Sequence, residues 1–199
     1  MNHGSNPFHN DKKIGGRIMN LWWLVTSSVY CSYSELKQRR CLALGWREIG
    51  DLERYIKEKK GWERQFKTFV QLKGNIAYPR DKRWTEEDSA LTGVPTIFWN
   101  LLQIREGDYV AVIETGNQLT LGSIEVRGVG RVTQDAMRSY HFNEEFHHAH
   151  EVCAGLEWKD WDLAHYGELD KPSRSFKALL QDNDQLDKVD EAWGAITAE

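Results

Sequence analysis

Hydrophobic and polar residues alternate with two different periods along this chain, which predicts a mixture of strands and helices. Apolar or alternating runs that predict strands cover residues 20–27, 41–44, 108–114, 118–133 and 152–158. Apolar residues at helical spacing predict helices over 34–40, 51–60, 61–72, 96–104 and 172–180, and a last one around Leu186, Val189 and Trp193. Strands near both ends, with helices mainly in the first half, predict an α+β fold: a curved mixed sheet or small β-barrel flanked by helices.

Three segments stand out from this regular pattern. Residues 118–133 are long enough for one bent strand, or for two strands with a bulge near Gly122 or Gly128. Residues 140–150 are expected to form a loop. Residues 73–95 are predicted to be a second, longer loop, and loops of about 20 residues are uncommon in compact domains unless they are functional or disordered. This longer loop carries an aromatic and basic set, namely Tyr78, Arg80, Lys82, Arg83 and Trp84.

Charge divides the chain into three parts. Residues 1–19 are rich in Asn, Gly, His and Lys and are expected to form a flexible arm. Residues 20–180 are expected to form the domain, and residues 181–199 an acidic C-terminal tail. The net charge of −4 hides this asymmetry: the tail holds six acidic residues and one lysine, which leaves residues 1–180 near neutral at +1. A near-neutral body with clustered bases neither indicates nor excludes a nucleic-acid binder.

The composition, with 40% hydrophobic and 28% charged residues, is typical of a soluble globular protein. The densest apolar run, residues 21–25, is far too short to span a bilayer, and the first twenty residues lack the apolar core of a secretion signal. We therefore expect no membrane association. Cys31, Cys41 and Cys153 are unclustered, which favours reduced thiols and a cytoplasmic location. The nine tryptophans are many for 199 residues, and flat rings beyond the needs of a core suit ligand stacking.

Residues 42–52 join a predicted strand to a predicted helix through a turn that holds a tryptophan. Gly45 and Gly50 permit backbone conformations that residues with a Cβ resist. Asp51 is suited to cap the following helix, because its carboxylate can accept from free backbone amides. Trp46 has no periodic apolar partner beside it. Its ring either fills the core from the edge or faces a pocket as a stacking surface.

Several motifs occur in an order that is specific as a set. They are a strand that ends in a polar loop (residues 22–28), Gly45-Trp46 followed by Gly50-Asp51-Leu52, Gly107-Asp108 before a Val-rich strand, Gly-Val-Gly-Arg-Val over 128–132, and Leu156-Glu157-Trp158. This order resembles the EVE-type branch of the PUA-like superfamily, whose small β-barrel domains are related to YTH readers and to modified-DNA-sensing domains of restriction systems. The resemblance covers roughly residues 20–160.

The resemblance implies a reader rather than an enzyme. Members bind nucleic acid that carries a modified base, and we expect a methylated or hydroxymethylated base, in DNA rather than RNA. Extruding a base costs a few kcal/mol, and stacking on an aromatic ring returns about 1–3 kcal/mol. Trp46 matches the pocket tryptophan of the family, residues 26–28 match the loop that faces the pocket, and two further tryptophans are candidates for the other walls. The expected pocket residues are Trp46, Thr26, Ser27, Ser28, Trp84 and Trp99.

Clustered bases are the electrostatic footprint of phosphate binding, although each cluster taken alone is equally consistent with a solvated surface. The expected contacts to the nucleic-acid backbone are Arg39, Arg40, Arg80, Lys82 and Arg83. Because several members of the family sit beside nuclease or motor domains, the resemblance also implies a nuclease or motor partner protein.

Two alternatives to a reader remain. A metal-dependent nucleotide-processing enzyme could use His141, His147, His148, His150 and Cys153. Zinc ligands must converge tetrahedrally, however, and no paired Cys-x-x-Cys occurs, so no metal site is expected. The sequence also lacks a Gly-x-Ser-x-Gly elbow and a phosphate-binding glycine loop, so neither catalysis nor a cofactor is expected. The other alternative is a protein-interaction module of a restriction or defence system, which docks through the acidic tail and the long loop.

Overall fold

The computed structural model describes residues 13–14, 17–27, 30–57, 63–85, 93–115, 126–170 and 179–198. The fold is α+β, as expected, and is built on two main sheets. The larger sheet has the strand order β10-β3-β5-β6-β9, formed by Leu179–Gln181, Leu21–Ser27, Tyr109–Thr115, Val126–Arg131 and Glu157–Asp160. The smaller sheet has the order β4-β8-β7, formed by Leu42–Leu44, His150–Val152 and His141–Phe142. A short hairpin is formed by β1 (Lys13–Ile14) and β2 (Arg17–Ile18).

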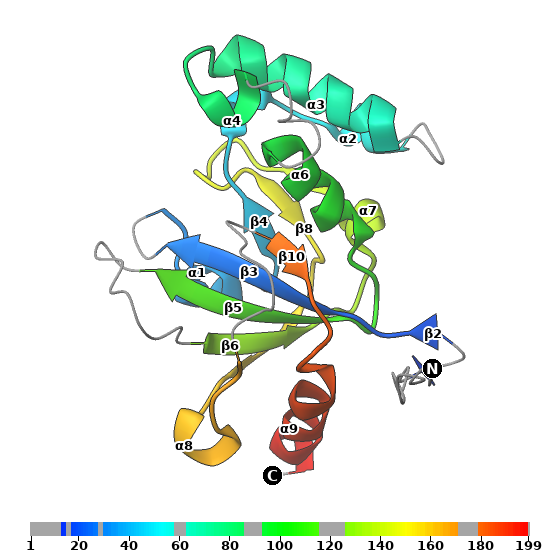
Figure 1. Ribbon diagram of the computed structural model, residues 1–199, viewed down its shortest axis with the longest axis vertical. Coiled ribbons are helices and arrows are strands. Elements are labelled where there is room, and N and C mark those ends of the chain that lie inside the picture. The colour runs from blue at the N-terminus through cyan, green and yellow to red at the C-terminus, as the bar shows by residue number, and fades with distance from the viewer. Residues whose placement is uncertain are drawn as a thin grey trace, which may run out of the picture.

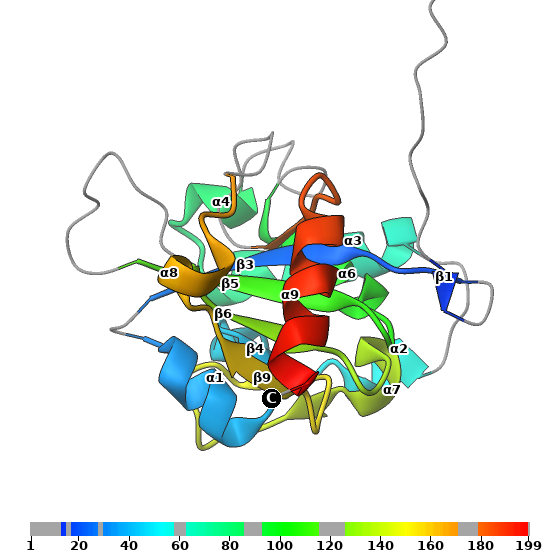
Figure 2. The same ribbon diagram turned by 90° about the horizontal axis from the view of Figure 1, so that it is seen from below.

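Helical segments cover both faces of the five-stranded sheet. They are α1 (Tyr33–Arg39), η1 (Arg47–Ile49), α2 (Glu53–Lys57), α3 (Glu63–Ala77), α4 (Lys82–Thr85), α6 (Val94–Gln103), α7 (Ala136–Ser139), α8 (Leu163–Tyr166) and α9 (Leu186–Ala198). Figure 1 shows α8 and α9 on one side of the sheet, and α6, the smaller sheet and then α3 with α4 on the other. In Figure 2, seen from below, α9 crosses the face of the large sheet. Within the described residues, no helix is long and apolar enough to cross a membrane.

Strand β3 lies in the middle of the large sheet and is covered on both faces. It pairs in parallel with β5 and antiparallel with β10. Successive side chains of a strand point to opposite faces, and accordingly Trp22 belongs to the core cluster on the α6 side, whereas Trp23 belongs to the cluster under α9. Both rings are buried, so the run of five apolar residues at 21–25 exists because this strand must fill two cores.

A bulge lies next to Gly128, one of the two positions that were predicted; the other, Gly122, lies outside the described residues. Gly128 of β6 pairs with Val112 of β5, and Val126 pairs with Ile113, so Arg127 is the extra residue. A Cβ at Gly128 would lie 2.1 Å from the hydroxyl oxygen of Tyr33. The glycine therefore lets α1 approach the sheet closely.

Of the two sheet arrangements that were expected, the mixed sheet is found, whereas the sheet does not close into a barrel. In the described part of the chain β10 and β9 form the two edges of the large sheet, and the smaller sheet is separate from it. The strands at 20–27, 41–44 and 108–114 are confirmed as β3, β4 and β5. Helices α1, α2, α3, α6 and α9 are found near their expected positions, although residues 58–62 lie outside the described residues.

The predicted loop at 73–95 is also wrong over most of its described length. Helix α3 continues to Ala77, α4 forms at Lys82–Thr85, and α6 begins at Val94, while residues 86–92 lie outside the described part. Gly74, near the start of the predicted loop, lies inside α3. A Cβ there would lie 1.8 Å from Cε3 of Trp84, so Gly74 makes room for a ring that packs against the helix backbone.

Two further predictions need correction. The strand expected at 152–158 is split into β8 and β9, because Cys153 has a φ of +56° and Gly155 a φ of +81°, and the chain turns there. The helix expected at 172–180 is replaced at its end by β10, which begins at Leu179; residues 171–178 lie outside the described residues. The acidic segment from residue 181 contributes the last residue of β10 and then forms α9, whose Val189 and Trp193 are buried.

The packing of Gly74 gives a matched test on two helical glycines. Gly74→Ala should destabilise the fold by about 1–3 kcal/mol, because the added methyl group overpacks against Trp84. Gly194→Ala, in α9, should stabilise it by roughly 0.5–1 kcal/mol, because a Cβ there meets nothing within 4 Å and alanine favours a helix. Urea unfolding of both variants measures the difference. If both variants shifted the free energy of unfolding equally and in the same direction, the packing of Trp84 on α3 would be contradicted.

Candidate functional site

The candidate site forms where β4 ends and the chain turns into η1. Trp46 follows Gly45 at this point and has φ 61° and ψ 42°, which is the left-handed region. A non-glycine residue in that region costs roughly 1–2 kcal/mol and persists only when its surroundings fix it. Such strained residues cluster at functional sites. The indole ring of Trp46 is only partly buried.

A buried hydrogen-bond chain holds the backbone of this turn at both ends. The amide of Leu52 donates to the hydroxyl oxygen of Tyr140 at 3.2 Å, and that hydroxyl lies 2.8 Å from Nδ1 of His150. Nε2 of His150 lies 3.3 Å from the carbonyl oxygen of Trp46. One proton arrangement satisfies every group: Tyr140 donates to Nδ1, and the Nε2–H of a neutral His150 donates to Trp46. Burial lowers the pKa of His150 to about 4, so the ring is neutral at neutral pH.

Two buried aromatic rings pack against the ring of Trp46. Trp84 meets it edge-on at 6.1 Å between centroids, and Phe98 of α6 lies at 5.8 Å. Trp84 is fully buried and stacks on Tyr78 at 5.9 Å with an interplanar angle of 8°. The hydroxyl of Tyr78 in turn bonds to Glu48 of η1. Trp84 therefore backs Trp46 and offers no accessible face of its own.

One basic side chain lies over the Trp46 ring. The guanidinium carbon of Arg83 is 5.9 Å from the ring centroid, within the range of a cation–π contact. Asp81 anchors Arg83 through hydrogen bonds of 3.0 Å and 2.5 Å, and the Arg83 side chain remains 58% exposed. The ring thus has a fixed aromatic support and a cationic partner on a solvent-exposed side chain.

The loop after β3 reaches this region through a histidine segment. The carbonyl of Ser27 accepts from the amides of Tyr30 and Cys31 at 3.2 Å and 2.9 Å, which closes a tight turn. Tyr30 stacks on His147 at 5.3 Å, and the His147 ring lies 5.5 Å from that of His148. The His148 ring is next to Gly45, where a Cβ would lie 3.8 Å from its Cε1 and Nε2 atoms.

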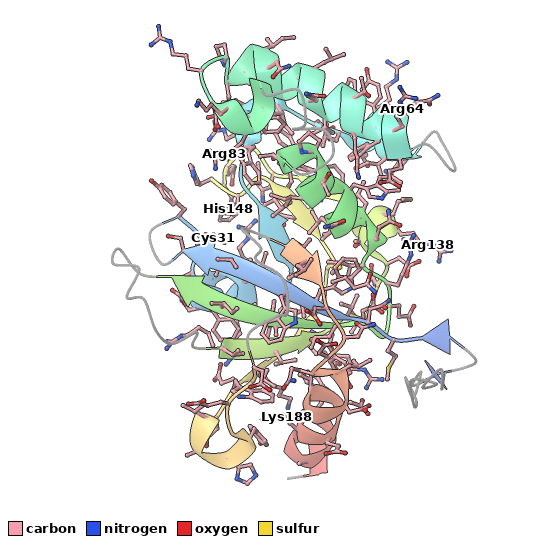
Figure 3. The ribbon with its side chains drawn as sticks, in the orientation of Figure 1. Cys31, Arg64, Arg83, Arg138, His148 and Lys188 are labelled. Carbon is pink, nitrogen blue, oxygen red and sulfur yellow. The ribbon has the colours of Figure 1, made fainter. Side chains whose placement is uncertain are left out.

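Figure 3 shows Arg83, His148 and Cys31 along one side of the molecule, from α4 past the smaller sheet to the end of β3. This is the side on which the sequence predicted a pocket between the loop after β3 and the turn at Trp46. Thr26 is buried and its hydroxyl donates to the carbonyl of Cys31, so it closes the turn after β3. Trp99 packs on Phe66 of α3 at 5.9 Å. Ser28 lies outside the described residues.

The predicted phosphate contacts differ in how accessible they are. Arg39 is paired with Glu151, lies 3.6 Å from the centroid of the Phe146 ring, and has a side chain only 12% exposed. It therefore has a structural partner already. Arg40 is exposed and donates to the carbonyl of Gly155 at 3.1 Å. The other predicted contacts, Arg80, Lys82 and Arg83, are exposed. Arg47 is exposed as well. Sequence reasoning missed it because it lies next to Trp46 and outside any cluster of bases.

The histidine segment does not assemble a metal site in the part of the chain that the structure describes. No group of three or more His, Cys, Asp or Glu side chains is arranged there to hold a metal ion. Cys31, Cys41 and Cys153 are free thiols, and burial raises the pKa of each. His148 and His150 instead flank the turn at Gly45 and Trp46, a role that no local sequence signal could have indicated.

Acid should destabilise the fold through these two histidines. The pKa of each is lowered by burial from an ordinary 6.5 to about 4, so between those values the unfolded chain binds protons that the folded chain does not. Stability is therefore complete above pH 6.5 and falls as the pH drops toward 4, and for His150 the loss reaches about 3 kcal/mol. Urea midpoints between about pH 7 and 4.5 measure this.

A matched pair of variants shows whether His150 causes the loss of stability in acid. His150→Gln should make the pH profile shallower but not flat, because His148 still contributes, whereas the same change at His165, exposed on α8, should leave the slope as in the wild type. A wild-type midpoint that does not move over this range would contradict the neutral, buried state of His150.

No protein-family model matches this chain, and no curated protein matches its sequence. The candidate site is therefore identified from its geometry alone. It consists of a strained tryptophan that is fixed by a hydrogen bond and aromatic packing, and that lies beside a histidine loop and exposed bases.

Proposed function

We propose that this chain is a PUA-like, EVE-type reader that binds nucleic acid through a modified base stacked on Trp46. One observation carries the proposal: Trp46 is held in a strained backbone conformation with its ring partly exposed, although a fold could bury a tryptophan without that strain. The hydrogen bond from His150 fixes the backbone of Trp46, and the packing of Trp84 and Phe98 positions its ring. A ring fixed in advance loses little conformational freedom when a ligand stacks on it.

Stacking offsets the cost of taking the base out of its helix. Extrusion costs a few kcal/mol, least for a base that is already unpaired, and base–aromatic stacking contributes about 1–3 kcal/mol. Arg83 lies over the same ring and must move outward, or form the second side of a sandwich, when a base enters. Its exposed side chain allows either movement.

The basic residues around the ring favour a polyanion. Arg47, Arg80 and Lys82 are exposed, and two of them lie within a few residues of Arg83. Their contacts would be to phosphates and would not depend on sequence, whereas the ring would hold the extruded base. A methylated or hydroxymethylated base in DNA is the preferred ligand, with RNA as the second choice, and a nuclease or motor protein is the proposed effector partner.

Replacing the tryptophan tests the proposal directly. Trp46→Ala should remove the preference for modified over plain oligonucleotide and lower affinity for the modified one roughly tenfold or more, because a stacking surface is lost. The ligands are DNA and RNA oligonucleotides that carry methylated adenine, methylated cytosine or hydroxymethylated cytosine, titrated by fluorescence anisotropy.

The control variant is Trp161→Ala. Trp161 is buried under α9, and its indole N–H donates to the carbonyl of Gly167 at 2.9 Å. This change should lower stability without altering the preference for modified oligonucleotide. Equal binding of modified and plain oligonucleotides by the wild-type protein would refute the reader function.

A further inference from the structure

His148 is held in a fixed loop at the entrance to the turn. The amide of Asn143 donates to the carbonyl of Ala149 at 2.8 Å, which closes the loop between β7 and β8. Phe146 of this loop lies under the guanidinium of Arg39. The His148 ring rests against Gly45, one residue before Trp46, with Cε1 and Nε2 on the Gly45 side. Figure 3 shows it between Arg83 and Cys31.

One polar atom of this ring is unsatisfied. Nδ1 of His148 is buried and has no hydrogen-bond partner within the described residues. A buried polar atom without a partner costs about 1–3 kcal/mol, and such atoms in folded proteins call for an explanation. His150, two residues away, shows the contrast, because both of its ring nitrogens have partners.

The charge state of His148 limits which ligand can supply the missing partner. Burial lowers its pKa to about 4, and the neighbouring His147 and Arg39 act in the same direction. The ring is therefore neutral, with one N–H and one lone pair, and attracts a polar neutral group rather than an anion. A phosphate suits Arg80 or Lys82 better, whereas the hydrogen-bonding edge of a heteroaromatic ring suits His148.

We propose that Nδ1 of His148 forms a hydrogen bond with the polar edge of the ring that stacks on Trp46, and that His148 thereby determines which base is accepted. This inference rests on the proposed function and adds a specificity residue to it. Stacking alone tolerates any base, because every base has a flat face. A site built to make a hydrogen bond rejects a ligand that leaves its polar group unpaired.

Two substitutions at this position separate hydrogen bonding from shape. His148→Phe keeps an aromatic ring but removes the polar atom, and should weaken binding of the preferred modified oligonucleotide about tenfold. His148→Asn places an amide near the position of Nδ1 and should bind within roughly threefold of the wild type. His165→Asn, on the exposed surface of α8, is the control and should bind as the wild type does. Thermal melts check that each variant folds.

A second measurement does not depend on the variants. In protein with ¹⁵N-labelled histidine, the Nδ1 resonance of His148 should shift when the preferred oligonucleotide is added, while that of His165 should not. The inference is overturned if Nδ1 does not shift, or if His148→Phe binds like the wild type while Trp46→Ala loses binding. If the wild type shows no binding that depends on Trp46, the proposed function fails and this inference fails with it.

Discussion

The carboxyl group of Asp108 fixes the start of the parallel strand pair on which the whole fold is built. It is 1% exposed and accepts from the amide of Asn20 at 3.1 Å, the indole of Trp22 at 2.9 Å and the amide of Arg105 at 3.0 Å. A parallel pair cannot be joined by a short turn, so β3 and β5 depend on contacts made across a long crossover. Asp108 supplies these contacts at one end, and without them its buried neighbours would lose their partners. The opposite end of the pair is then free to carry the loop after β3.

That arrangement explains why the candidate site lies where it does. In the described residues, the crossover between β3 and β5 contains α1, β4, η1, α2, α3, α4 and α6, so the turn at Trp46 is built from residues that also close the core. Its second support, the pair Tyr140 and His150, comes from a segment that enters after β6. The turn is therefore held by two parts of the chain that are far apart in sequence. A strained tryptophan can persist there because neither part can relax alone.

Local patterns in the sequence were sufficient for the strands and helices whose residues follow one period, such as β3, β5 and α6. They failed after Leu72, where α3 continues past Gly74 because this glycine accommodates Trp84, and at Cys153, whose left-handed backbone is stabilised by a hydrogen bond from its amide to the hydroxyl of Ser139 at 2.7 Å. Both are tertiary effects, and no window of neighbouring residues contains them. Trp46 could be singled out from its place in a turn. Its partner His150 could not, because the bond between them joins residues more than a hundred positions apart.

The acidic residues of the last segment and the bases around Trp46 lie on opposite sides of the large sheet. The acidic residues of the last segment lie on or near α9, where Asp190 accepts from the hydroxyl of Tyr109 at 2.8 Å and Trp193 packs on the same tyrosine. Figures 1 and 2 place α9 on the face of the large sheet that is opposite α3 and α4. The helix therefore does not cover the bases around Trp46. Under the proposed function, its negative charge would repel a polyanion from the far face, while Arg47, Arg80 and Lys82 would attract it to the near one. The near side also carries Glu48 and Asp81, but the hydroxyl of Tyr78 donates to Glu48 and the guanidinium of Arg83 donates to Asp81. The proposed basic surface therefore consists of the bases that remain exposed beside them, Arg47, Arg80 and Lys82.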